Sequence, residues 1–161
     1  MSNILILAGC ILIPLAVGGF SGVATRTAIK GWYNQLQKPG FNPPNWLFGP
    51  VWTVLYILMG VSLYIIIRQE PSAERERALL FFTAQLVLNF FWSIIFFYYK
   101  RLGFALIEIA VLWFFIIGMI VSFIAVKPLA GYLQIPYLCW VSFASILNAS
   151  VWRLNRNTPA V

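Results

Sequence analysis

The stretch GFALIEIAVLWFFIIGMIVSFIAV, residues 103–126, decides the fold class of this chain. Its one charged residue is Glu108, and nearly all of its other residues are apolar. A helix that crosses the hydrocarbon core of a bilayer needs about 20 consecutive apolar residues, and this stretch supplies them. It therefore predicts a transmembrane helix rather than a segment of a soluble core.

Four further apolar stretches of similar length share the chain with it. They cover residues 4–25, 46–67, 78–98 and 131–154. Over the 161 residues, 61% are hydrophobic and 9% are charged, and the mean hydropathy is +0.87. So few polar residues could not cover a soluble core. We expect an all-α integral membrane bundle of five transmembrane helices, forming a single domain over residues 1–161.

The basic residues predict an orientation for this bundle. They stand singly or in pairs near the ends of the apolar stretches, as membrane-anchoring residues do, so we do not expect nucleic acid as a partner. Loop 26–45, the connection around Lys100 and Arg101, and the C-terminal end carry more Lys and Arg than the other connections. The positive-inside rule places these three segments in the cytoplasm.

Loop 26–45 is the longest connection. The sequence GWYNQLQKPGFNPPNW (31–46) is not typical of a flexible linker. Three prolines fix backbone angles, and the aromatic side chains carry apolar surface that must be buried. Two interpretations remain open: a segment that lies in the membrane interface, or a lid folded over a cavity between helices. Asn42 followed by Pro43 predicts a helix N-cap and the start of the second long helix.

Several kinds of chemistry are disfavoured by what the sequence lacks. It has no histidine, and histidine is the commonest metal ligand and the usual general base near neutral pH. No phosphate-binding loop, dinucleotide fingerprint or nucleophile elbow is present. We therefore expect no metal site and no conventional enzyme. Gly18 and Gly22 have the spacing of a close helix contact, either within the chain or between two copies.

Polar and aromatic residues recur at helical spacing inside two of the apolar stretches. One face carries Phe81, Gln85, Asn89, Trp92 and Phe96, and another carries Tyr137, Trp140, Ala144, Asn148 and Val151. Amide side chains lose hydrogen bonds when they face lipid, so both faces should point inward. The amides either join neighbouring helices or line a ligand cavity. Tryptophans buried several residues inside a helix offer stacking surface to a flat aromatic ligand.

Glu108 is the one acid well inside an apolar stretch. It lies within snorkelling distance of the interface near Lys100 and Arg101. We expect it to pair with a basic residue there, and a proton or substrate role is the alternative.

Three segments together resemble the TspO family, the group of tryptophan-rich sensory proteins and translocator proteins formerly called peripheral benzodiazepine receptors. They are WYNQLQKPGFNPPNWLFGPVWTVLY (32–56), AQLVLNFFWSIIFFYYKRLGFALIE (84–108) and PYLCWVSFASILNASVWRLN (136–155). The resemblance covers nearly the whole chain.

The resemblance implies five transmembrane helices, often in a homodimer, with the first loop closing a pocket in each subunit. It implies binding of porphyrins and other tetrapyrroles, such as protoporphyrin or haem, and of synthetic aromatic ligands, with no cofactor required. The matching positions around that pocket are Trp32, Trp46, Trp52, Gln85, Asn89, Trp92, Phe104, Trp140, Ala144 and Leu147.

The family offers more than one function for such a pocket. Transport or sensing of tetrapyrroles is one, and light-dependent degradation of protoporphyrin through Trp52 and Trp140 is the alternative. Animal members bind cholesterol through a Tyr in the last helix, but LNASVWRLN (147–155) has none, so we do not expect a sterol site. Membrane lipid is an expected partner. The expected location is a bacterial plasma or inner membrane, and an outer membrane of a bacterium or mitochondrion is the alternative.

Overall fold

The structure is a computed structural model that describes residues 3–157. Within this range, five helices are long and apolar enough to cross a membrane. They cover Asn3–Ala28, Asn45–Ile67, Ala73–Tyr98, Leu102–Val126 and Pro128–Asn155. The prediction of an all-helical bundle with five transmembrane helices is confirmed.

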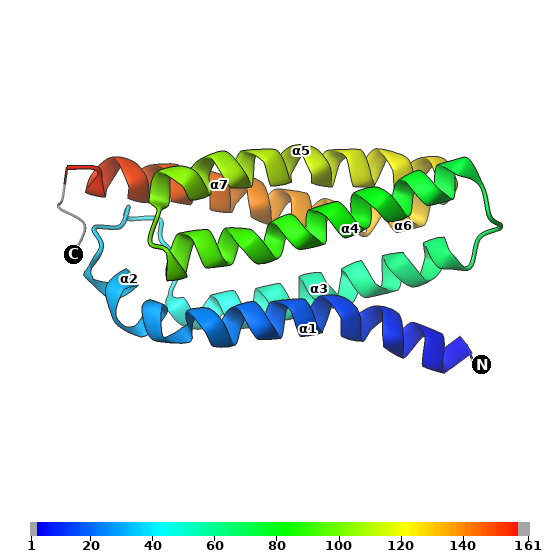
Figure 1. Cartoon of the computed structure of the whole chain (residues 1–161), viewed down its shortest axis with the longest axis horizontal. Helices are drawn as coiled ribbons and strands as arrows, with labels where there is room; N and C mark the ends of the chain where they lie inside the picture. Colours follow the sequence, from blue (N-terminus) through cyan, green and yellow to red (C-terminus); the bar gives the residue numbers. More distant parts are fainter. Residues whose placement is uncertain (1–2, 158–161) are drawn as a thin grey trace.

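The helical elements follow one another with short connections. They are α1 (Asn3–Lys30), α2 (Trp32–Gln35), α3 (Asn45–Ile67), α4 (Ala73–Ser93), the π-helical turn η1 (Ile94–Tyr98), α5 (Leu102–Val126), α6 (Pro128–Tyr132) and α7 (Ile135–Asn155). The long helices run side by side along one axis (Figure 1). The closest pairs are α4 with α5, α1 with α3, and α5 with α7.

Residues 31–44, here called the lid, lie at one end of this bundle and include α2 (Figure 1). The connection from η1 to α5 and the end of α7 lie at the same end. The three segments richest in basic residues therefore lie at the same end of the bundle. We call it the lid end. Its placement in the cytoplasm remains a prediction.

Two helix boundaries differ clearly from those predicted from hydropathy. Helix α1 continues to Lys30 rather than ending near residue 25, since its polar last turns meet no Pro or Gly before Gly31. Helix α4 begins at Ala73 rather than 78, because Ser72 caps it by accepting a hydrogen bond from the Arg75 amide at 3.1 Å. Hydropathy does not detect a polar first turn, whereas a capping serine does mark it.

The predicted N-cap at Asn42 is wrong. Helix α3 begins at Asn45, after Pro44. The Asn42 side chain instead accepts a hydrogen bond from the Tyr33 hydroxyl at 2.9 Å and donates one to the Pro43 carbonyl. The Asn42 side chain therefore makes a tertiary contact within the lid instead of the helix cap that the local pattern predicted.

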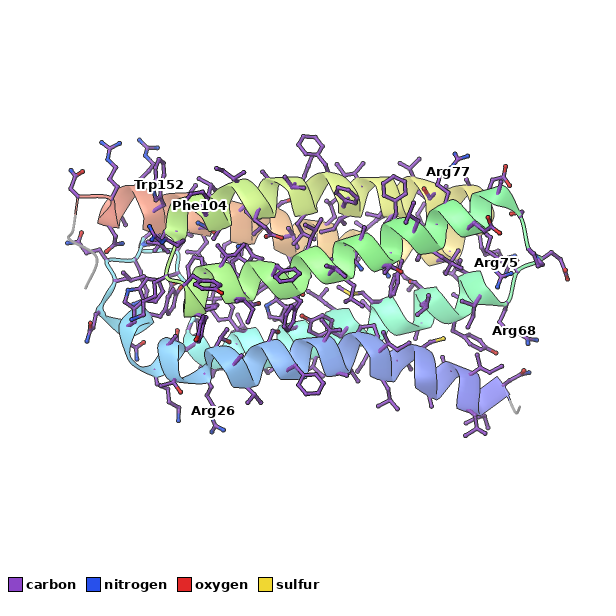
Figure 2. All side chains as sticks on the ribbon, viewed as in Figure 1. Arg26, Arg68, Arg75, Arg77, Phe104 and Trp152 are labelled. Atoms are coloured by element: carbon purple, nitrogen blue, oxygen red, sulfur yellow. The ribbon has the colours of Figure 1, made fainter. Side chains whose placement is uncertain are left out.

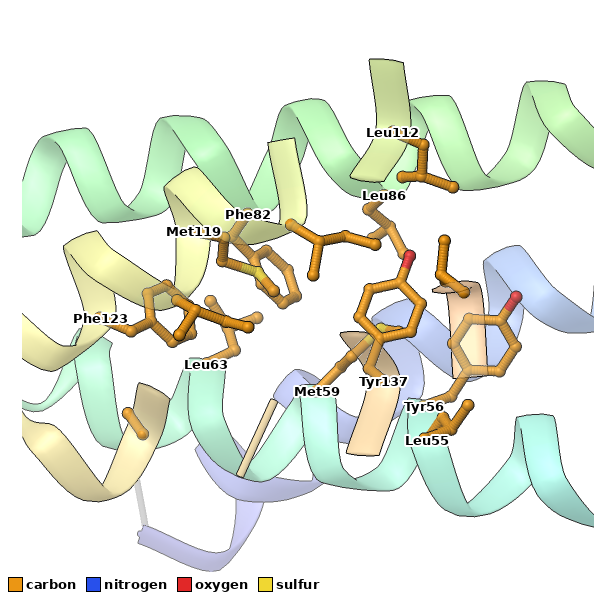
Figure 3. Close-up of a cluster of buried hydrophobic side chains, with 14 of the residues drawn as sticks. Leu55, Tyr56, Met59, Leu63, Phe82, Leu86, Leu112, Met119, Phe123 and Tyr137 are labelled. Atoms are coloured by element: carbon orange, nitrogen blue, oxygen red, sulfur yellow. The ribbon is translucent and has the colours of Figure 1, made fainter. Parts of the chain in front are cut away.

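The apolar core extends from the middle of the bundle into the half away from the lid, and Figure 3 shows part of it. Met59 and Ile66 of α3, and Met119 and Phe123 of α5, have no measurable solvent exposure. The Phe82 ring of α4 stacks on Phe123, with 6.2 Å between ring centroids and 13° between planes. These side chains fix the spacing of α3, α4 and α5.

One polar residue joins the last part of the chain to α3 within this half. Gln134, which is fully buried between α6 and α7, donates hydrogen bonds from Nε2 to the Ser62 hydroxyl at 2.6 Å and to the Leu58 carbonyl at 3.3 Å. A buried amide in lipid is costly unless paired, so this contact fixes α6 against α3.

Gly60 sets how closely α1 and α3 approach. A Cβ at this position would overlap the Cα of Ile11 and lie 2.8 Å from the Cys10 carbonyl oxygen. Only a residue without a side chain allows the two backbones this near.

Gly60→Ala should lower the free energy of unfolding by about 1–3 kcal/mol, because the added methyl group forces α1 away from α3. Chemical unfolding of the purified protein in detergent micelles measures the change. Gly9→Ala is the matched control on α1, since a Cβ there meets nothing within 4 Å. Equal stability of the two variants would contradict the close approach.

Candidate ligand-binding site

A cavity of about 350 Å³ lies between α1, α3 and the end of α4, next to the lid. We call it the central cavity. Its lining residues are Leu15, Gly18, Gly19, Ser21, Gly22, Thr25, Tyr33, Asn45, Phe48, Gly49, Trp52, Thr53, Tyr56, Trp92, Ser93 and Phe97. Aromatic rings, glycines and neutral polar groups make up most of this lining, and no charged side chain is among them.

The cavity exists in part because three of the residues that α1 contributes to its lining are glycines. Gly18 lies against the Tyr56 ring, where a Cβ would overlap the ring. Gly19 and Gly22 border the open space, and a Cβ at either meets nothing within 4 Å. The sequence GGFSG therefore has two effects: Gly18 admits the Tyr56 ring, and the other two glycines leave open space beside α1.

Stacked aromatic rings form the wall opposite α1. The Trp52 indole stacks on Tyr56, with centroids 5.3 Å apart and planes 26° apart. Its ring also meets Tyr137 of α7 in an edge contact at 6.1 Å. Such rings present flat apolar surface, and these contacts hold the indole in place before any ligand arrives.

A chain of buried hydrogen bonds supports this wall and joins three helices. The Tyr56 hydroxyl donates to Asn89 Oδ1 at 2.8 Å, and Asn89 Nδ2 donates to the Tyr137 hydroxyl at 3.1 Å. Tyr137 in turn donates to Gln85 Oε1 at 3.0 Å. We call these four residues the amide–tyrosine network. All four are at most 6% exposed, so in lipid each depends on the others for its hydrogen bonds.

Trp92, the second tryptophan of the cavity, is held in a similar way. Its indole Nε1 donates to Asn148 Oδ1 of α7 at 3.2 Å. Asn148 Nδ2 then donates to the Leu102 carbonyl at the start of α5, at 3.0 Å. Both amides predicted to face inward on α4, and Asn148 on α7, therefore join helices.

Tyr33 closes the lid side of the cavity. Its ring, 4% exposed, packs against Phe96 and Phe97 of η1, with centroids 6.0 Å and 5.6 Å away. Burial raises the pKa of its hydroxyl to about 12, so the group stays neutral and can donate to Asn42. The interpretation of this loop as a folded lid fits this packing.

The lid is also fastened to the far end of the chain. The Gln37 amide donates to Asn155 Oδ1 at 3.0 Å, and Asn155 Nδ2 donates to the Gln37 carbonyl at 2.8 Å. Nearby, the Phe41 ring meets Phe143 of α7 edge-on at 6.2 Å. These contacts bridge the lid to α7 over the mouth of the bundle.

A second hollow, about 590 Å³, opens between α3 and α7 on the outside of the bundle. We call it the lateral groove. It is lined by Pro50, Val51, Val54, Leu55, Pro136, Cys139, Trp140 and Phe143. The two hollows lie on opposite faces of α3. Phe48, which lines the central cavity, meets Trp140 of the lateral groove edge-on at 5.8 Å.

The residues predicted for the site are distributed over several places. Trp52 and Trp92 line the central cavity, whereas Trp140 lines the lateral groove. Gln85 and Asn89 belong to the amide–tyrosine network behind the wall. Ala144 and Leu147 are buried on α7, and Trp32 packs edge-on against Phe96.

Two members of the predicted set lie on the outer surface. Trp46 is 72% exposed at the start of α3, and Phe104 is 65% exposed at the start of α5 (Figure 2). Their contact with a ligand remains a prediction. Conversely, sequence reasoning did not assign Phe48, Tyr56 or Gly22 to the site, although the glycine run was a usable signal for open space.

Glu108 does not form the expected pair with Lys100 or Arg101. Both carboxylate oxygens are buried and make no hydrogen bond to any residue that the structure describes. The prediction assumed that the side chain would reach back to the interface, whereas it lies between Ala105 and Leu112 on the buried side of α5.

Five apolar helices long enough to cross a membrane, three of which border an aromatic cavity, define a multi-pass integral membrane protein. Comparison with known proteins narrows this class. The sequence model of the TspO/MBR family matches residues 10–153, and the chain belongs to this family.

Relatives come from all three domains of life. The tryptophan-rich protein TspO of Chlorobaculum tepidum is 42% identical over 154 residues, which cover 95% of this chain and 98% of that protein. TspO of Archaeoglobus fulgidus is also 42% identical, covering 95% and 99%. The human translocator protein is 39% identical over 127 residues, covering 77% and 75%.

Asn89→Leu should lower the free energy of unfolding by about 1–3 kcal/mol, because it leaves the Tyr56 hydroxyl without an acceptor and removes a donor from Tyr137. Unfolding in detergent micelles measures this. Thr83→Val is the control on the same helix: Thr83 is exposed and its hydroxyl bonds only to Leu79 of its own helix, so its effect should stay within about 0.5 kcal/mol. A loss no larger than the control's would contradict a structural role for the network.

Proposed function

We propose that this protein binds porphyrins or related tetrapyrroles, such as protoporphyrin or haem, in the central cavity. The observation that supports this most is the preorganised indole of Trp52, stacked on Tyr56 and facing a space that α1 leaves empty. A flat, conjugated ligand gains the most from such a wall, since offset stacking rewards planar rings.

The lining also suits a ligand held by contact rather than through a metal. The chain has no histidine, and the polar groups around the cavity are hydroxyls, a side-chain amide and an indole. Ser21, Thr25 and Thr53 already donate to carbonyls of their own helices. Their oxygens can still accept a hydrogen bond, so they fit the pyrrole N–H groups of a metal-free macrocycle.

Pockets for drug-sized ligands span about 300–1,000 Å³, so a cavity of about 350 Å³ is near the lower end of that range. It is small for a tetrapyrrole with its side chains. We therefore include a movement of Phe48 away from Trp140 in the proposed binding step, because it would enlarge the cavity on the side of α7.

Two physiological uses of this site fit the fold. Some relatives are named translocator proteins and others a tryptophan-rich sensory protein, so we propose transport or sensing of tetrapyrroles for this chain. The lid, fastened to α7 by Gln37 and Asn155, is the element that would open or signal occupancy. Homodimer formation and a cytoplasmic lid end in a bacterial plasma membrane belong to the same proposal.

Light-dependent degradation of protoporphyrin is less well supported by the arrangement of the tryptophans. It calls for Trp52 and Trp140 at one ligand, whereas they line different hollows on opposite faces of α3. Degradation stays a prediction, and binding is the function that we propose.

Gly22→Leu should weaken protoporphyrin binding by about tenfold or more, because the new side chain extends into the space that the ligand needs. Quenching of tryptophan fluorescence by added protoporphyrin, with the protein in lipid nanodiscs, measures the dissociation constant.

Gly9→Leu is the matched control for this variant. It makes the same change on the same helix at a position where a Cβ also meets nothing within 4 Å, but it lies outside the lining of the central cavity. Equal affinities for wild type, Gly22→Leu and Gly9→Leu would place the ligand elsewhere. Absence of quenching in the wild type would refute tetrapyrrole binding altogether.

A further inference from the structure

Charge is distributed unevenly between the two ends of the bundle. Seven cations stand at the lid end: Arg26, Lys30, Lys38, Lys100, Arg101, Arg153 and Arg156. The sequence has only four acidic residues. Glu70, Glu74 and Glu76 lie at the opposite end, between α3 and α4 or in the first turn of α4, and Glu108 is inside α5. The cations of the lid end therefore have no acidic side chain beside them, and the cavity mouth lies in a positive field.

Lys38 is the member of this set whose ammonium group contacts a residue that lines the central cavity. The group is 4.8 Å from the centroid of the Tyr33 ring, and Tyr33 lines the cavity. The Lys38 side chain is half-buried, which distinguishes it from the exposed Arg26 and Lys30.

The ammonium group of Lys38 has hydrogen-bonding capacity to spare. It donates one hydrogen bond, to the Leu36 carbonyl at 3.2 Å, out of the three that a lysine can donate. Contact with the Tyr33 ring compensates part of the charge, but such a contact is worth only about 0.5–2 kcal/mol. A carboxylate is the partner that would accept the remaining hydrogen bonds of this ammonium group.

The backbone around Lys38 is held in place rather than free. The residue before it, Gln37, exchanges two hydrogen bonds with Asn155 of α7, and Pro39 follows. A cation on a fixed segment costs less entropy to engage than one on a mobile loop.

The other cations are less suited to a ligand in the cavity. Figure 2 shows Arg26 pointing away from the bundle. Lys100 lies over the Trp32 ring at 5.9 Å, and Trp32 is not among the residues that line the cavity. Arg153 and Arg156 are exposed at the end of α7.

We propose that Lys38 binds a carboxylate of a flat aromatic ligand whose ring system occupies the central cavity, an inference that rests on the proposed function. It specifies the ligand class as planar acids, and it gives the ligand a direction. The acidic edge faces the lid and the cytoplasmic or external water beyond it, while the opposite edge points toward Leu15 and Tyr56. Neutral planar molecules of the same shape bind more weakly because they leave the ammonium group unpaired.

The test compares protoporphyrin, which carries two propionates, with its uncharged dimethyl ester. Wild type, Lys38→Gln and the control Lys30→Gln are placed in nanodiscs of zwitterionic lipid, so that no anionic headgroup competes. We expect Lys38→Gln to weaken binding of protoporphyrin by about tenfold, in line with a charge-assisted hydrogen bond. Binding of the ester should be the same in all three proteins, and Lys30→Gln should bind both compounds as wild type does.

Each other outcome counts against the assignment in a recognisable way. Equal weakening of acid and ester by Lys38→Gln would show that Lys38 only supports the lid. Unchanged acid binding in Lys38→Gln would remove Lys38 as the partner, and a loss in Lys30→Gln instead would assign the role to the exposed face of α1. A wild type that binds the acid no better than the ester would overturn carboxylate recognition while tetrapyrrole binding stands. If it binds neither, the proposed function itself fails.

Discussion

The amide–tyrosine network is the interaction on which the rest of the site depends. In a bilayer, apolar side chains gain little by leaving lipid for one another, so helix positions are set by close packing and by polar groups that need partners. Tyr56, Asn89, Tyr137 and Gln85 supply such partners across α3, α4 and α7. Because Tyr56 is fixed by its hydroxyl, Trp52 has a rigid ring to stack on, and the cavity wall keeps its shape without a ligand.

The cavity itself results from a balance between glycines on two helices. Gly18 of α1 admits the Tyr56 ring and Gly60 of α3 lets α1 come close, whereas Gly19 and Gly22 of α1 border open space. Tight packing and open space along α1 are thus produced by the same residue type. Whether a glycine packs or opens space depends on what the neighbouring helix presents opposite it, here a tyrosine ring or nothing.

Hydropathy and helical periodicity predicted much of this structure from the sequence. The length of apolar stretches identifies membrane helices, and the spacing of Gln85, Asn89 and Trp92 identified an inward face. The partition of tryptophans between cavity and groove could not be predicted, because it depends on the rotation of α3 and α7 relative to each other. Asn42 shows the same limit on a smaller scale: its neighbours in sequence favour a cap, but its neighbour in space, Tyr33, decides its role. The lack of a hydrogen-bond partner for the Glu108 carboxylate likewise depends on which face of α5 is turned toward the other helices.

The bond pair between Gln37 and Asn155 joins residues 118 positions apart. During synthesis, the segment that covers the cavity emerges before the residue that fastens it. The first four membrane helices can insert and associate before the fastening exists. A ligand present in the membrane could therefore reach the nascent cavity before the lid is fixed, and completion of the final helix is the step that closes it.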